Sequence, residues 1–175
     1  MKNMRKTLPL TLSAMLTALG VVLLWLGGLI EVLDLSVAAV VALFVFFAHR
    51  ELPRPCAYMI YLGTSLLSVL LLPVKGAAIF YAAFAGWYPM LKYHLDHLPS
   101  LPAWCLKLLV LNATAALLLF GGSFLLMLPL EALEFYLFVF AAGNFSFVLY
   151  DILLGRLLIL YAARLRPRVQ RFLYH

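Results

Sequence analysis

Apolar runs that follow one another with almost no polar face constrain this chain more than any other feature. A helix that crosses a bilayer needs about 20 apolar residues, and most of these runs reach that length. Hydrophobic residues make up 66% of the chain and charged residues only 11%, whereas soluble domains carry about a quarter charged residues. The sequence therefore predicts an all-α integral membrane protein.

Polar breaks rich in proline and glycine separate the apolar runs and mark the expected turns. The basic start, Met1 to Lys6, leads into a run longer than the core of a signal peptide, with no small-residue cleavage site, so we expect a retained first span. The breaks leave six expected spans, at residues 8–30, 35–49, 55–73, 76–93, 103–128 and 134–162. We expect one six-helix domain over residues 1–175.

The distribution of basic residues settles the doubtful second span, which at residues 35–49 is short for a hydrocarbon core of about 30 Å. Cytoplasmic loops are enriched in Lys and Arg. If all six spans cross, every basic residue of the thirteen except Lys75 lies on one side. This bias predicts cytoplasmic N- and C-termini. The basic residues sit in short clusters between spans, so the net charge of +6 indicates topology and not nucleic-acid binding.

Motifs for catalysis are absent from the sequence. No phosphate-binding loop, zinc-protease or serine-hydrolase pattern occurs, and Asp151 has no second intramembrane acid with which to form a protease pair. We therefore expect no enzyme activity, no catalytic residue and no cofactor. His94, Asp96 and His97 have metal-ligand side chains, but a polar cap beside Pro99 is the simpler interpretation, and no metal site is expected.

Polar groups within the spans are the informative minority, because burying them in lipid is costly. Asn112 and Asn144 fall near the middle of the last two spans, where they either bond to each other or face a polar cavity. Asp151 can pair with Lys107 or Arg156. These alternatives stay open at this point.

Small residues recur at four-residue spacing on two spans, which lets helices approach closely. They serve either packing within the bundle or docking by a partner's helices, and the first span is the better docking candidate. The residues are Ser13, Ala14, Thr17 and Ala18 on the first span, and Ala78, Ala82 and Gly86 on the fourth.

Acidic and aromatic residues gather at the expected outer rim. Such aromatic residues normally form a belt at the membrane interface, but with acids and a lone lysine they could also roof a small-molecule pocket. The rim residues are Trp25, Glu31, Asp34, Lys75, Phe80 and Tyr81.

The pattern resembles the substrate-binding S components of energy-coupling factor (ECF) transporters, which are six-helix proteins of the bacterial cytoplasmic membrane. The basic start leads into residues 12–19, similar to the Ala-x-x-x-Ala face of the family's first helix. Residues 151–156 and the basic tail after them are similar to the last helix of some members. Overall size and topology agree.

The resemblance implies a division of labour between subunits. Ala14 and Ala18, with Thr17 between them, would face a transmembrane coupling subunit, and separate cytoplasmic ATPases would supply energy for uptake. A small vitamin-like ligand would bind in the outer half of this multi-pass membrane protein. The candidate ligand-binding residues are Trp25, Glu31, Asp34, Lys75, Tyr81, Asn112 and Asn144.

Two other functions fit the same pattern. One is a structural subunit of a bacterial wall-synthesis complex, similar to the rod-shape-determining membrane protein. The other is a small protein that binds membrane lipid or lipid-linked precursors through its basic inner face.

Overall fold

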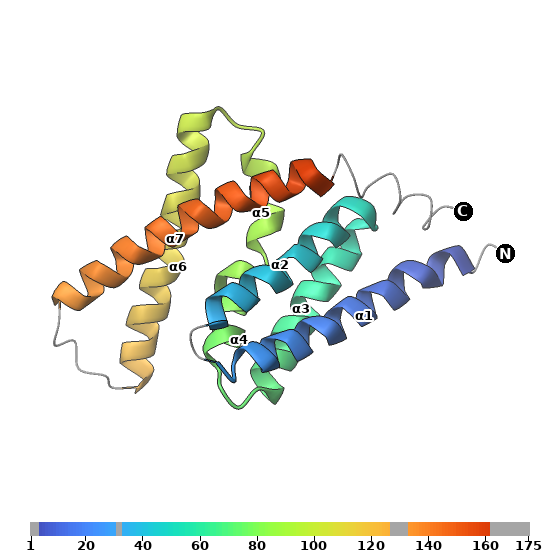
Figure 1. Ribbon diagram of the computed structural model, residues 1–175, viewed down its shortest axis with the longest axis horizontal. Coiled ribbons are helices and arrows are strands. Elements are labelled where there is room, and N and C mark those ends of the chain that lie inside the picture. The colour runs from blue at the N-terminus through green and yellow to red at the C-terminus, as the bar shows by residue number, and fades with distance from the viewer. Residues whose placement is uncertain (1–3, 31–32, 127–132, 162–175) are drawn as a thin grey trace. The chain divides into compact units, whose positions relative to one another are not determined.

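Helices account for all regular structure in the described residues. The computed structural model describes residues 4–30, 33–126 and 133–161, and the all-α prediction is confirmed for them. The elements are α1 (Met4–Gly27), α2 (Asp34–Glu51), α3 (Arg54–Leu71), α4 (Gly76–Phe80), the π-helical turn η2 (Tyr81–Ala85), α5 (Tyr88–Leu95), α6 (Ser100–Leu126) and α7 (Leu133–Leu160) (Figure 1).

Three of the described helices are long and apolar enough to cross a membrane. The stretches are Thr7–Gly27 in α1, Arg54–Leu71 in α3 and Ser100–Leu118 in α6. This supports a membrane protein by length and composition. Helix α2 also has an apolar middle, but it carries Asp34, Arg50 and Glu51 at its two ends. These charged residues distinguish it from the three candidate spans.

Prolines explain the sharp break between α2 and α3. Leu52 is extended, with φ −108° and ψ 163°, as expected of a residue that precedes proline. Pro55 lies in the first turn of α3, where its missing N–H costs nothing because no partner would exist for it. The predicted boundary at residues 49–55 therefore agrees with the structure to within a few residues.

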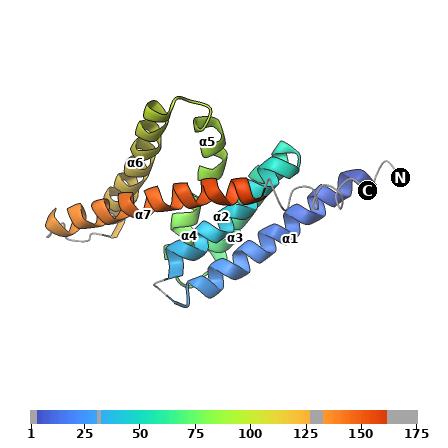
Figure 2. The ribbon, with the colours of Figure 1, turned by 45° about the horizontal axis from the view of Figure 1, so that its top comes forward.

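Helix α2 lies at the centre of the first of two compact units, which runs to Lys107. It contacts α1, α3, α4, η2 and α5, and Figures 1 and 2 show α1, α2 and α3 side by side. Its 18 residues exceed the predicted span of residues 35–49. Small residues at helical spacing let neighbouring helices approach α2 closely on several sides, which suits it to a central position. The fully buried ones include Ala38, Val41, Ala42, Val45 and Ala48.

The predicted fourth span, residues 76–93, is interrupted. The Gly86 N–H donates to the Tyr81 carbonyl oxygen at 2.8 Å, five residues back, which is the bond of a π turn. The Tyr61 hydroxyl of α3 donates to the Ala82 carbonyl oxygen at 2.8 Å. The stripe of small residues predicted at four-residue spacing along this span is therefore not continuous, because it assumed an unbroken α-helix.

The second compact unit begins at Leu108. Its described elements are the later part of α6 and helix α7. The expectation of one domain over residues 1–175 stays a prediction.

Candidate functional site

Trp25, Asp34 and Lys75 of the predicted rim fall at one end of the first unit, which we call the Asp34 end, whereas Tyr81 is buried in the core. There α1 and α3 end, and α2 and α4 begin. Trp25 is exposed near the end of α1. Lys75 is also exposed, and its Nζ donates to the Val69 carbonyl oxygen at 2.6 Å, near the end of α3. Glu31 lies outside the described residues.

Asp34 turns its carboxylate toward the start of α4. A Cβ atom added at Gly76 would lie 2.8 Å from Asp34 Oδ2, so a larger residue at position 76 would require the carboxylate to shift. Asp34 Oδ1 is buried and has no hydrogen-bond partner in the described residues. A buried carboxylate oxygen without a donor costs free energy, which makes Asp34 a candidate for contact with a ligand.

One face of α3 carries hydroxyl groups, and sequence reasoning missed it. The residues are Tyr61, Thr64, Ser65 and Ser68, at spacings of three, four and seven from the first. These spacings bring side chains to one side of a helix. Thr64 and Ser68 are fully buried. The spacing itself was the signal that could have found this face, since the rest of the helix is largely apolar.

Thr64 and Tyr81 bring two hydroxyl groups into the core of the first unit. Both side chains have an exposed fraction of 0%, and the Thr64 hydroxyl is the polar neighbour of the Tyr81 hydroxyl. Neither oxygen makes a hydrogen bond of standard geometry within the described residues. Since nearly all buried polar groups in proteins are paired, such a pair needs a functional or structural explanation.

Close packing holds these hydroxyls in place. A Cβ atom added at Gly20 of α1 would lie 3.2 Å from Thr64 Cγ2. The Tyr61 and Tyr81 ring centroids lie 6.4 Å apart. The hydroxyl pair is therefore fixed by α1, α3 and η2 together.

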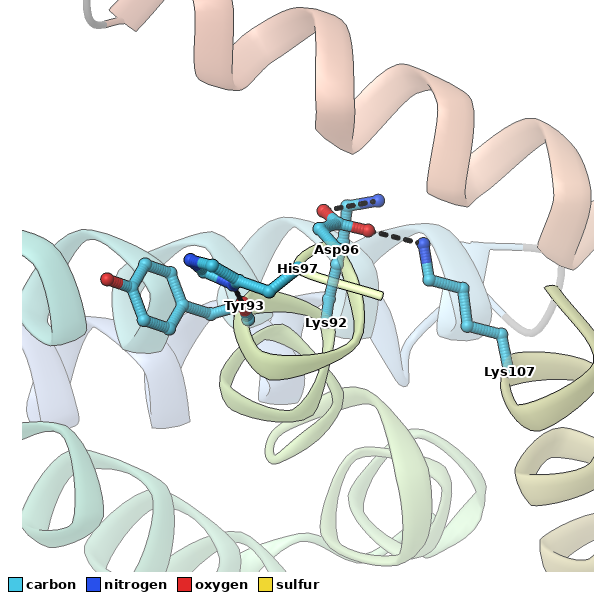
Figure 3. Close-up of polar contacts among 5 residues, drawn as sticks. All are labelled: Lys92, Tyr93, Asp96, His97 and Lys107. Atoms are coloured by element: carbon cyan, nitrogen blue, oxygen red, sulfur yellow. Dashed lines mark hydrogen bonds and ion pairs between the residues drawn. The ribbon is translucent and has the colours of Figure 1, made fainter. Parts of the chain in front are cut away.

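Two buried lysines share one aspartate at the opposite end of the first unit (Figure 3). Lys107 Nζ donates to Asp96 Oδ1 at 2.6 Å, and Lys92 Nζ lies 3.4 Å from Asp96 Oδ2. Both lysine side chains are 5% exposed, and that of Asp96 is 41% exposed. Sequence reasoning treated Lys92 as a topology signal only and did not name Asp96 as a partner of Lys107, while the pairing of Asp151 with Lys107 or Arg156 stays a prediction.

The neighbouring histidines behave as expected of a polar cap. Nδ1 of His94 lies 2.9 Å from the Met90 carbonyl oxygen, and Nδ1 of His97 lies 2.7 Å from that of Tyr93. In the tautomer that carries the proton on Nδ1, each ring donates to its own helix. The Tyr93 carbonyl lies in the last turn of α5, where partners within the helix run out, so the His97 ring satisfies it.

In the second unit, Asn112 and Asn144 bond to each other. Each Nδ2 donates to the other residue's Oδ1, at 3.0 and 2.8 Å, and also to the carbonyl oxygen four residues earlier in its own helix, at 2.9 and 2.8 Å. All four amide hydrogens are thus engaged. This bond between the two helices is one of the two alternatives that the sequence predicted. Each Oδ1 keeps one lone pair that could accept a hydrogen bond from a ligand.

The small residues of α1 divide between two faces. Ser13 and Gly20 are buried, and a Cβ atom added at Gly63 of α3 would lie 3.1 Å from Thr17 Cγ2. Thr17 therefore packs against α3, whereas Ala14 and Ala18 are exposed. Of the three predicted docking residues, the two alanines are the ones that a partner can reach directly.

Comparison with models of protein families, with curated proteins and with solved structures finds no match to this chain. Its function is therefore argued from the residues themselves.

Proposed function

We propose that this chain is the substrate-binding membrane subunit of an ECF-type importer and captures a small vitamin-like molecule for uptake. The observation that carries the proposal is the pair of fully buried hydroxyls of Thr64 and Tyr81, without standard hydrogen bonds in the described residues. An unpaired buried hydroxyl costs about 1–3 kcal/mol. A ligand that offers hydrogen-bonding groups would recover this free energy on binding.

The topology of the proposed subunit has six crossings and both termini in the cytoplasm of a bacterium. Helices α1, α3 and α6 contain the three candidate spans. The other three crossings would be α2, the stretch from α4 to α5, and α7. An α-helix of 18 residues, the length of α2, spans about 27 Å, which is close to the thickness of a hydrocarbon core. With this topology the Asp34 end faces outward, as capture of an external molecule requires.

Co-purification after membrane solubilisation tests the proposed function most directly. We expect the chain to bring down a transmembrane coupling subunit and cytoplasmic ATPases, because the chain has no ATPase motif of its own. Recovery with wall-synthesis proteins and without any ATPase would overturn the proposal and favour the structural subunit.

The two buried hydroxyls give a second test, in which Thr64→Val and Tyr81→Phe remove the hydroxyls and keep the side-chain shape. We expect each variant to be as stable as the wild type or up to about 1 kcal/mol more stable without ligand, since a desolvation cost disappears. Thermal unfolding in detergent, scanned against water-soluble vitamins and their precursors, should show a stabilising ligand for the wild type. The same ligand should lose most of its effect on both variants.

Tyr61→Phe is the matched control, because it removes a tyrosine hydroxyl that is paired with the Ala82 carbonyl oxygen. It should lower stability by about 0.5–1.5 kcal/mol, the opposite sign to Tyr81→Phe. If the ligand stabilises the Tyr81→Phe and Thr64→Val variants as much as the wild type, the ligand site does not include these hydroxyls.

A further inference from the structure

A group of arginine and histidine side chains lies at the end of the first unit opposite the Asp34 end. The group draws on three elements: the end of α2, the start of α3, and the end of α5 with the turn after it. We call it the arginine–histidine patch, and its residues are His49, Arg50, Arg54, Tyr93, His94 and His97.

Ring contacts hold the patch together. The Tyr93 ring centroid lies 5.3 Å from that of His49, 5.7 Å from that of His94 and 5.2 Å from that of His97. Arg50 is held in turn by the Phe46 ring, with its guanidinium carbon 6.0 Å from the ring centroid. Tyr93 therefore contacts the rings of all three histidines, and Arg50 lies over the Phe46 ring of α2.

The patch is cationic. Arg50 and Arg54 are exposed, and within the described residues no carboxylate forms an ion pair with either of them. Of the nearby acids, Asp96 pairs with Lys92 and Lys107, and Glu51 is buried whereas both arginines are exposed. Two exposed guanidinium groups without an ion pair in the described residues are suited to bind phosphate, because each offers a planar fork of donors.

The position of the patch along the helices favours the phosphate of a lipid headgroup over free phosphate. Arg54 is the first residue of the candidate membrane span Arg54–Leu71. One turn later, Tyr58 is exposed, and Met59 and Leu62 follow as exposed apolar side chains. A cation at the start of an apolar helix, followed by an interfacial tyrosine and by apolar side chains, is typical of the level of lipid headgroups.

We propose that the arginine–histidine patch binds the phosphate of an anionic phospholipid headgroup, with the acyl chains lying along the exposed apolar side of α3. This inference requires only that α3 crosses the membrane. It is independent of the ligand proposed at the Thr64 and Tyr81 hydroxyls and of any ECF partner, so either proposal can fail without the other.

The test is a lipid titration of the full-length, delipidated chain followed by native mass spectrometry. Phosphatidylglycerol and phosphatidylcholine are added in equal amounts, and the retained lipids are counted. We expect the wild type to retain phosphatidylglycerol preferentially. The double variant Arg50→Gln/Arg54→Gln should lose that preference by about tenfold, because each basic group near an anionic membrane surface contributes to headgroup binding.

Two control variants distinguish the effect of charge at the patch on lipid preference from the effect of charge elsewhere in the chain. Arg50→Lys/Arg54→Lys keeps the charge and should keep most of the preference. Lys75→Gln removes an exposed cation at the Asp34 end and should leave the preference unchanged. An equal loss in Lys75→Gln would overturn the proposal, because net charge alone would then explain retention.

Inorganic phosphate distinguishes the two sources of the anion. We expect phosphate, added at a large excess over lipid, to leave the retained phosphatidylglycerol in place, since it lacks the acyl chains. Displacement by phosphate, equal retention of both lipids by the wild type, or full retention by Arg50→Gln/Arg54→Gln would each overturn the proposal.

Discussion

Replacing Ala14 and Ala18 together with leucine should abolish binding of the proposed coupling subunit while the chain itself still folds. Both alanines are exposed on α1, and small residues at four-residue spacing let a second helix approach closely. Leucine at both positions would hold the helices apart, so we expect affinity for the proposed coupling subunit to fall by more than about tenfold. Co-purification of the two subunits after solubilisation measures the loss, and size-exclusion chromatography reports whether the variant is folded.

A matched control comes from α6. Ala113 is also an exposed alanine on an apolar helix, and Ala113→Leu should leave binding of the partner unchanged. If the double variant of α1 fails to insert or fold, the two alanines pack within the protein. If it folds and binds its partner normally, the docking surface lies elsewhere.

Gly86→Ala should destabilise the protein by about 1–3 kcal/mol, the usual cost of forcing extra atoms into a packed core. The new Cβ atom would lie 2.6 Å from Tyr61 Cδ2 and 3.0 Å from Tyr81 Cε1. Since real Cβ atoms do not approach other atoms so closely, a ring must move. Movement of Tyr61 would also break its hydrogen bond to the Ala82 carbonyl oxygen. Denaturant or thermal unfolding in detergent measures the change.

Gly143→Ala is the control for this substitution. A Cβ atom added at Gly143 meets nothing within 4 Å, and alanine is favoured over glycine within a helix by about 0.5–1 kcal/mol. We therefore expect the two glycine variants to change stability in opposite directions. Equal effects would mean that the Tyr61 ring moves aside freely and does not fix η2.

The helices could be predicted from the sequence because lipid and core burial both select for apolar runs. The structure has a helical stretch for every predicted span, with ends that agree within a few residues. The prolines at 53 and 55 marked one boundary because they restrict the backbone locally. Helix α2 was the doubtful case, and it is buried on several sides in the structure. A buried central helix can be short and rich in alanine, so its length alone was a poor guide.

The site was less accessible to sequence reasoning. Tyr81 was selected as a rim aromatic residue, but its buried partner Thr64 was not, since a threonine in an apolar helix is unremarkable until its neighbours are known. The link from Lys107 to Asp96 depends on the turn between α5 and α6 bringing the two residues together. The π turn depends on packing among Tyr61, Tyr81 and Gly86, which periodicity does not encode.

The π turn also sets the rotational phase of everything that follows it in the fourth helical stretch. A π turn holds one residue more than an α turn, and one residue corresponds to about 100° of rotation about the helix axis. The side chains of α5 therefore point in directions that an unbroken helix from Gly76 would not give them. Adding or removing one residue within Tyr81–Ala85 would turn Tyr93 of α5 away from His49 of α2 while leaving α4 unchanged.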